Sequence, residues 1–301
     1  MTENIKRLFS EKLSCVLFSE EMKKHTTFKI GGPADVFVEC ASADEVSLAI
    51  KLCKENSLPW MIHGNGSNML VSDKGIEGVV IHIGNKMNNI EVKGNTIFAE
   101  AGALLSLVSN AALKASLTGL EFAAGIPGTL GGGIYMNAGA YGGELCDVIK
   151  FVSYIDEDGV LQRDSVEKLE FSYRHSKFSD KNYAIVSAEF ELMPGDASKI
   201  KETMTDLNKR RCEKQPLEYP SAGSTFKRPE GHFAGKLIQD AGLMGYSIGG
   251  AKVSEKHAGF VINAGEAKAE DVLRLISYIK ETVFEKFGVM LEPEVRLTGR
   301  K

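Results

Sequence analysis

A glycine-rich stretch from residue 119 to residue 143 is the part of this chain best suited to binding an anion. Nine of its 25 residues are glycine, three of them consecutive, and it contains neither lysine nor arginine. Glycine admits positive φ and lets other atoms approach the backbone, so main-chain N–H groups can receive a phosphate without side-chain charges. We therefore predict a phosphate or pyrophosphate cradle here; a set of tight turns between strands is the plainer alternative.

A second glycine-rich turn, GNGSN (64–68), directly follows a short apolar strand predicted for residues 60–62. Such a place is usual for a phosphate-binding loop. Met69 stands where G-x-G-x-x-G requires its third glycine, and neither loop contains G-x-x-x-x-G-K-[ST]. The chain thus offers two anion cradles without either of the commonest nucleotide signatures.

Composition restricts the class of protein. The chain has 301 residues, 43% of them hydrophobic and 25% charged, with a net charge of −4, which is typical of a globular protein of about two domains. The net charge does not indicate a surface for nucleic acid, and neither a signal peptide nor an apolar membrane span is visible. Five cysteines without a C-x-x-C pair favour reduced thiols in the cytoplasm and no metal site. We expect a soluble, cytoplasmic protein.

Hydrophobic periodicity predicts the elements that must position these loops. Helices are predicted over residues 1–24, from a capping box at Ser42 and Glu45, from Leu104 to Gly119, after residue 196, near 233–243 and over 269–288. The apolar face expected for the third of these includes Leu107, and the last is expected to face inward with Val272, Ile276, Ile279, Val283 and Phe287. Strands are predicted within residues 25–40, 60–62, 78–83, 88–92, 96–102, 151–164 (a hairpin turning at Asp158-Gly159), 183–192 and 291–297. The turn residues at 193–196 predict a domain boundary.

Five motifs, in order, resemble the UDP-N-acetylenolpyruvoylglucosamine reductase family. They are GNGSN (64–68), GIPGTLGGGIYMNAGAYGGE (125–144), SYRHS (172–176), AGSTFK (222–227) and LEPEVR (291–296). The resemblance covers roughly residues 25–299 and implies an α+β protein. Its first part would be a two-part FAD-binding unit of the vanillyl-alcohol-oxidase type (1–195, with subdomains of about 1–84 and 85–195). A smaller α+β substrate-binding domain would follow (196–301), with its last strand free to pack back on the first part.

The family implies an NADPH-dependent flavoenzyme of peptidoglycan precursor synthesis that reduces UDP-N-acetylglucosamine enolpyruvate to UDP-N-acetylmuramate. Hydride would pass from reduced FAD to C3, and Ser224 would give a proton to C2. Arg174 would hold the substrate carboxylate, because a guanidinium can bind two oxygens at once. Glu294 would face the developing enolate with a raised pKa. Serine is a weak acid, so a relay is needed, and Lys214 is one candidate.

The resemblance also implies binding residues for non-covalent FAD and for the UDP-sugar. For FAD these are Gly64, Asn65, Gly66, Ser67, Asn68, Gly125, Gly128, Thr129, Gly131, Gly132, Asn137 and Gly139. For the substrate they are Tyr173, Lys214 and Lys227. His63, just before the first loop, matters because some relatives of this fold attach flavin covalently through histidine. We expect a monomer that binds neither nucleic acid nor membrane.

The interval between Arg174 and Ser224 is too short for the tyrosine-bearing loop of the longer class of this family, so the chain resembles the shorter class. The residues that contact the uridine diphosphate in the longer class therefore cannot be assigned to positions in this chain. Candidates by charge and position are Lys227, Arg228, Lys236 and Lys256.

Each site residue also has a plainer interpretation. Arg174 suits a surface ion pair, Ser224 a turn or helix cap, and Glu294 the solvated face of an edge strand. Two further hypotheses for the whole chain stay open: another flavin oxidase or dehydrogenase of the same fold, and a colourless, non-catalytic sensor of nucleotide sugars.

Overall fold

The computed structural model describes residues 2–300, and these form two compact units that interleave along the chain. Unit 1 contains the segment up to Phe18 together with Val36–Asn65 and Gly78–Arg210. Unit 2 contains Ser19–Asp35, Gly66–Glu77 and the segment from Arg211 onward. The predicted domains, 1–195 and 196–301, are instead continuous in sequence, and that division stays a prediction.

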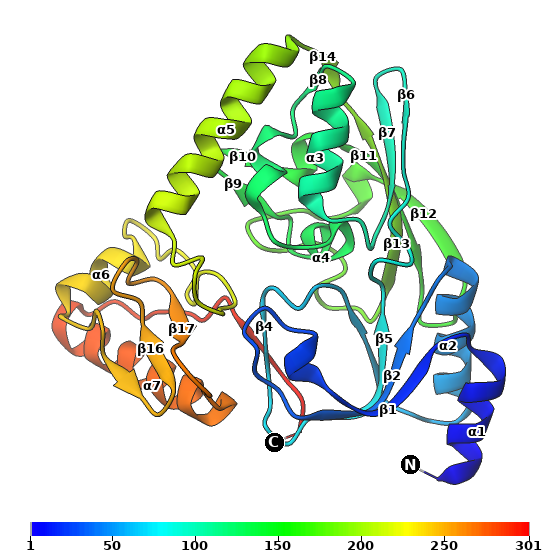
Figure 1. Cartoon of the computed structure of the whole chain (residues 1–301), viewed down its shortest axis with the longest axis horizontal. Coiled ribbons are helices and arrows are strands. Elements are labelled where there is room, and N and C mark those ends of the chain that lie inside the picture. Colours follow the sequence, from blue (N-terminus) through cyan, green and yellow to red (C-terminus); the bar gives the residue numbers. More distant parts are fainter. Residues whose placement is uncertain (1, 301) are drawn as a thin grey trace. The chain divides into compact units, whose positions relative to one another are not determined.

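Unit 1 contains a five-stranded sheet, most of a four-stranded sheet and two sheets of two strands each, with their helices (Figure 1). Its helices are α1 (Glu3–Lys12), α2 (Ala43–Glu55), α3 (Leu105–Lys114), α4 (Leu130–Tyr135) and most of α5 (Ala197–Lys214). Its strands are β3 (Trp60–His63), β6 (Ile90–Lys93), β7 (Thr96–Glu100), β8 (Leu117–Thr118), β9 (Gly139–Ala140), β10 (Gly143–Glu144), β11 (Ile149–Ile155), β12 (Leu161–Ser165), β13 (Ala184–Glu191) and β14 (Met193–Pro194). The strands β1 (Val16–Glu21), β2 (Pro33–Glu39) and β5 (Ile76–His82) each have residues in both units.

The first sheet has the order β1-β2-β5-β3, and β3 runs parallel to β5. The start predicted for α2 is confirmed: Ser42 Oγ accepts from the backbone N–H of Glu45 at 3.2 Å, while the Glu45 carboxylate accepts from the N–H of Ala41 at 2.8 Å in place of the reciprocal bond of a capping box. The helix predicted over residues 1–24 is wrong beyond Lys12. Val16–Glu21 forms an outer strand of this sheet beside β2, a pairing between distant segments that local periodicity does not reveal.

The second sheet is antiparallel, with the order β12-β11-β13-β7-β6. The hairpin predicted at Asp158-Gly159 is confirmed, since it joins β11 to β12. Helix α3 contacts β6, and α4 contacts β13 (Figure 1). In α3 the buried face runs through Leu105, Val108 and Ala112, whereas Leu107, expected on that face, is 47% exposed. The helix begins one residue later than expected and ends at Lys114, well before Gly119.

Unit 2 is built around one long helix and a small antiparallel sheet, β15-β16-β17 (Figure 1). Its elements are β4 (Met69–Val71), α6 (Ala234–Asp240), β15 (Ser247–Ile248), β16 (Ala251–Val253), β17 (Val261–Asn263), α7 (Ala269–Phe287) and β18 (Arg296–Thr298). Four apolar residues predicted to face inward on α7 are buried, namely Val272, Ile276, Ile279 and Val283. Phe287, also expected inward, is 41% exposed, because the helix ends there and Gly288 follows as its left-handed cap.

The last strand is shorter than predicted. Only Arg296–Thr298 forms a strand, parallel to β4, and Leu297 is 58% exposed. The preceding residues follow an extended course that makes single bridges, such as Phe226 with Pro293. The mixture of helices with largely antiparallel sheets confirms the predicted α+β class. Within residues 2–300, no helix has both the length and the apolar character that crossing a bilayer requires.

Candidate active site

The two predicted glycine-rich loops meet within unit 1. Asn65 Nδ2 donates to the carbonyl oxygen of Pro127 at 2.5 Å. A Cβ atom on Gly64 would lie 2.4 Å from Thr129 Oγ1, so only glycine permits this approach. The first two residues of the 64–68 loop therefore lie against the start of the second loop.

Thr129 presents a hydroxyl group at this junction. The residue is 5% exposed, and its Oγ1 is a buried oxygen for which residues 2–300 supply no hydrogen-bond partner. A buried polar atom left without a partner costs about 1–3 kcal/mol, so a ligand oxygen bound here would remove that cost. The junction of two glycine-rich loops and an unsatisfied hydroxyl fits the pyrophosphate of FAD.

Main-chain hydrogen bonds hold Thr129 in place. The backbone N–H of Leu130 donates to Ala103 at 2.7 Å, and that of Gly131 donates to Ala101 at 2.8 Å. Thr129 also forms the N-cap of α4 in an extended conformation. The loop between β7 and α3 thus fixes the cradle from behind.

The remaining predicted FAD residues of this stretch have different surroundings. Gly125 ends a 3₁₀ turn (Glu121–Gly125), Gly128 is buried, Gly132 is exposed within α4, and Gly139 lies in β9. Asn137 is 1% exposed, and both ends of its amide bind protein atoms: Nδ2 donates to Glu144 Oε2 at 2.9 Å, and Oδ1 accepts from the N–H of Cys146 at 3.1 Å. Its side chain is therefore engaged with the protein itself.

Arg174 lies in a two-residue turn of unit 1. Ser172 and His175 exchange two backbone hydrogen bonds of 3.1 Å, which leaves Tyr173 and Arg174 at the tip. Arg174 has a φ of +55°, a left-handed conformation that is rarely adopted by a bulky residue and costs about 1–3 kcal/mol. Its Nη2 donates to the carbonyl oxygen of Gly139 at 3.3 Å, and its guanidinium carbon lies 5.1 Å from the Tyr173 ring centre.

Unit 2 brings together the segments that carry Ser224 and Glu294. The backbone N–H of Glu294 donates to the carbonyl oxygen of Thr225, the neighbour of Ser224, at 2.8 Å. Two residues further, the N–H of Lys227 donates to the carbonyl oxygen of Glu292 at 2.9 Å. Ser224 is exposed and Glu294 is half-buried. Two motifs nearly seventy residues apart in the sequence are thus adjacent.

The position of Ser224 is fixed by its neighbours. Gly223 has a φ of +76°, which turns the chain immediately before Ser224. Thr225 is buried; its N–H donates to Gly259 and its Oγ1 accepts from the N–H of Val261, both at 2.9 Å. The exposed hydroxyl of Ser224 therefore projects from a rigid segment.

The second half of the GNGSN loop belongs to unit 2. Asn68 Nδ2 donates to the carbonyl oxygen of Glu294 at 3.1 Å, and the N–H of Arg296 donates to the carbonyl oxygen of Asn68 at 3.0 Å. The carbonyl oxygen of Gly66 accepts from the N–H of Thr27 at 3.4 Å. Of the predicted FAD ligands Gly66, Ser67 and Asn68, Asn68 thus adjoins the extended segment that carries Glu294, and Gly66 adjoins Thr27.

The predicted cationic ligands differ in their partners. Lys227 Nζ pairs with Glu292 Oε1 at 2.5 Å, and Lys256 Nζ donates to the carbonyl oxygen of Cys212 at 2.7 Å. Lys236 pairs with Asp240 one turn along α6. Arg228 stacks over the Phe233 ring, with its guanidinium carbon 4.0 Å from the ring centre.

Lys214 lies close enough to influence a histidine. Burial lowers the pKa of His257, and the positive charge of Lys214 lowers it further. His257 Nδ1 accepts from the N–H of Gly259, the residue whose carbonyl oxygen binds Thr225. Lys214 is therefore near the loop that supports the Ser224 segment.

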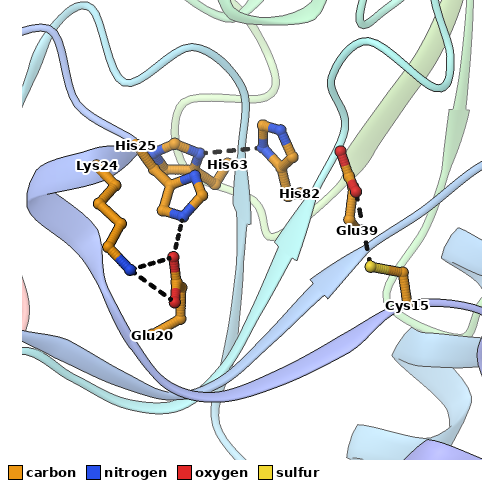
Figure 2. A network of polar contacts seen from close by, with 7 residues as sticks. All are labelled: Cys15, Glu20, Lys24, His25, Glu39, His63 and His82. Atoms are coloured by element: carbon orange, nitrogen blue, oxygen red, sulfur yellow. Dashed lines mark hydrogen bonds and ion pairs between the residues drawn. The ribbon is translucent and has the colours of Figure 1, made fainter.

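His63 ends β3 immediately before the first glycine loop, and Figure 2 shows it facing His82 of β5. Their Nδ1 atoms lie 3.3 Å apart, and the Phe37 ring centre is 5.2 Å from that of His82. His63 is 1% exposed. Two other polar contacts appear in Figure 2, apart from the histidine pair: Cys15 Sγ lies beside Glu39, and within unit 2 Glu20 binds Lys24 and His25. His63 is thus a packed residue supporting the loop.

Two protein-family models match the chain. Residues 34–165 match one described as an FAD binding domain, and residues 215–298 match the C-terminal domain of UDP-N-acetylenolpyruvoylglucosamine reductase. The reductase of Clostridium novyi is 53% identical over 298 residues, which cover 97% of each chain. That of Caldanaerobacter subterraneus subsp. tengcongensis is 52% identical over 301 residues, 100% of this chain and 99% of its own. The chain belongs to the UDP-N-acetylenolpyruvoylglucosamine reductase family.

Solved structures agree with this family assignment. The crystal structure of the reductase from Thermus caldophilus has a TM-score of 0.81 and 33% identity, over 94% of this chain and 98% of its own. The grass pollen allergen Phl p 4 has a TM-score of 0.51 and 16% identity over 64% of this chain and 44% of its own, which shows a shared fold alone. As a member of the reductase family with an FAD-binding domain, the protein is an FAD-dependent oxidoreductase, as predicted.

Sequence reasoning missed two side chains that support the turn of Arg174, one of the candidate site residues. Tyr135 and Ser176 anchor the turn of Arg174 through bonds to main-chain atoms. Ser176 stands within the SYRHS motif, so its position in that motif was the available signal. Nothing in the sequence around Tyr135 indicates such a contact.

Proposed function

We propose that this protein reduces the enolpyruvyl group of UDP-N-acetylglucosamine enolpyruvate to give UDP-N-acetylmuramate, with NADPH as the reductant. The observation that carries the proposal is the pair of glycine-rich loops meeting at the unsatisfied hydroxyl of Thr129, together with the adjacent Ser224 and Glu294 segments. The junction of the two loops fits a dinucleotide, and the paired segments of Ser224 and Glu294 fit a reaction centre. The family membership supplies the substrate class.

Bound FAD would supply the redox chemistry by which hydride passes from NADPH to C3 of the enolpyruvyl group. Thr129 and the backbone of Gly64 and Asn65 would hold its pyrophosphate. We propose non-covalent attachment, which the burial of His63 and its contact with His82 support. Residues 1–195 would form the FAD-binding part and 196–301 the substrate-binding part of a monomeric, cytoplasmic enzyme that binds no nucleic acid.

Three side chains would manage the charge that develops as the double bond is reduced. Arg174 would bind the substrate carboxylate, for which a planar guanidinium has matching geometry. Glu294 would be protonated with substrate bound, because a charged carboxylate would oppose an enolate. Ser224 would give its hydroxyl proton to C2, and Lys214 is the proposed source of its replacement. Tyr173 and Lys227 would complete the binding of the sugar nucleotide.

The test separates the two half-reactions of Ser224→Ala. We expect NADPH to reduce the bound flavin at the normal rate, because Ser224 takes no part in that step. Reoxidation by the enolpyruvyl substrate should slow by roughly 10²–10⁴-fold, the usual contribution of a general acid. Stopped-flow absorbance of the flavin measures both rates.

Ser221→Ala is the matched control, since Ser221 lies in the same loop and its bridge to Ile262 is made by the main chain. It should reoxidise as the unmodified protein does. Normal reoxidation of Ser224→Ala would remove Ser224 from the mechanism. Equal slowing in both variants would show instead that the loop is merely disturbed.

A further inference from the structure

The last residue of α4 and the segment that follows the helix contact the turn of Arg174 or its flank at three alternate residues. Tyr135, Asn137 and Gly139 each bind one part of that turn or its flank, and all of these residues lie in unit 1. Asn137 Nδ2 donates to the carbonyl oxygen of Ser172 at 3.2 Å. Gly139 accepts from the guanidinium of Arg174 itself. The cofactor cradle at the start of α4 and the turn of Arg174 are thus connected through one short segment.

Asn137 is shaped for this contact. Its φ of +43° is left-handed, a conformation that asparagine tolerates better than most residues. Its Oδ1 accepts from the N–H of Cys146, which leaves Nδ2 directed toward Glu144 and Ser172. An amide with both ends bound to the protein braces the turn, whereas the family resemblance implies that Asn137 is a ligand of FAD.

Ser176 provides the second attachment. Its Oγ donates to the carbonyl oxygen of Tyr135 at 2.9 Å, and the Tyr135 hydroxyl donates to the carbonyl oxygen of Ser179 at 3.0 Å. Ser176 is fully buried, so its hydroxyl would be costly to leave without a partner. The chain on the far side of Arg174 is therefore tied to the end of α4.

We propose that Asn137 and Ser176 are positioning residues that hold Arg174 in its left-handed turn and so aim its guanidinium at the substrate carboxylate. The proposal rests on the role proposed above for Arg174. A left-handed arginine persists only where its surroundings determine the backbone. Without the two attachments, φ at Arg174 relaxes toward negative values, and the guanidinium swings away from its place.

The principal test is Asn137→Gly. Glycine keeps the left-handed backbone and deletes only the amide, so the turn loses its brace without a new strain. We expect the dissociation constant of FAD and the rate of flavin reduction by NADPH to stay within about twofold. KM for the enolpyruvyl substrate should rise roughly tenfold, which corresponds to the loss of one or two hydrogen bonds that orient a binding group.

Ser176→Ala is the second variant, and it should show the same selective rise in KM, with recovery in Ser176→Thr. Asn56→Gly is the matched control, because Asn56 Nδ2 donates to the carbonyl oxygen of Leu52 at the end of α2, and within residues 2–300 its amide makes no hydrogen bond to the 172–176 turn. It should leave every one of these quantities unchanged. Hydrogen exchange should quicken at Ser172 and His175 in Asn137→Gly and remain slow in Asn56→Gly.

Arg174→Lys separates the inference from the function on which it rests. Asn137→Gly should add little to KM when combined with Arg174→Lys, since both changes act through the same guanidinium. A weakened affinity for FAD in Asn137→Gly would make Asn137 a cofactor ligand and overturn the inference. Unchanged KM in Asn137→Gly with a raised KM in Arg174→Lys would overturn it too. Unchanged KM in Arg174→Lys would instead remove the proposed role of Arg174.

Discussion

Gly64→Ala tests the meeting of the two glycine loops. The added Cβ would lie 2.4 Å from Thr129 Oγ1, whereas ordinary contact begins near 3.4 Å, so either the Thr129 side chain must rotate its hydroxyl away or one of the loops must move by about 1 Å. Forcing an extra methyl group into a packed site costs about 1–3 kcal/mol. Because 1.4 kcal/mol corresponds to a factor of ten, we expect the dissociation constant of FAD to rise roughly 5- to 150-fold.

The assay is titration of the apoprotein with FAD, followed by flavin fluorescence, with thermal unfolding of the apoprotein measured alongside. Thr129→Ala alone should weaken FAD binding by about 0.5–1.5 kcal/mol, the net worth of one hydrogen bond. In the double variant the clash disappears with Oγ1, so the two losses should be less than additive. Unchanged FAD affinity in Gly64→Ala, or strictly additive losses, would refute the placement of the cradle at this junction.

Two further predictions concern ionisable groups. Lys177 holds the pKa of Asp164 below its usual value in the folded protein. The pair therefore stabilises the fold fully at pH values above about 3.9, the pKa of an unfolded aspartate. This contribution is lost as the pH falls through the lowered pKa of the folded state. Asp164→Asn should therefore cost about 1–3 kcal/mol in urea unfolding at pH 7 and much less near pH 2; an equal cost at both would contradict it. Burial raises the pKa of Cys40 and of Cys53 to about 12, so iodoacetamide at pH 8 should label exposed Cys212 first. Labelling of Cys40 before unfolding would contradict this, and peptide mass spectrometry decides it.

Local signals in the sequence predicted the elements whose causes are local. The capping-box pattern of Ser42 and Glu45 gave the start of α2, and Gly288 gave the end of α7. The strand Val16–Glu21 was missed because its reason for being a strand is the neighbouring β2, which periodicity within residues 1–24 cannot show. Helix periodicity likewise misplaced Leu107, since spacing shows which residues share a face of α3 but tertiary packing decides which face is buried, here that of Leu105, Val108 and Ala112.

The candidate site was predictable in its parts but not in its connections. The glycine content of both loops indicated anion binding from the residues alone, while the roles of Ser224, Arg174 and Glu294 came from resemblance and stay predictions. That the GNGSN loop divides between a contact with Pro127 and one with Glu294 follows from tertiary hydrogen bonds that no spacing encodes. The engagement of the Asn137 amide with Glu144 and Cys146 is hidden from sequence for the same reason.

The visible absorption spectrum of the purified protein tests the central claim most directly. It should be recorded before and after anaerobic addition of NADPH, and again after UDP-N-acetylglucosamine enolpyruvate is added. We predict a yellow protein that NADPH bleaches and that regains its colour only with the enolpyruvyl substrate. A yellow protein that bleaches and then ignores this substrate would contradict the proposed reaction. A colourless protein that FAD cannot reconstitute would contradict the cofactor site itself.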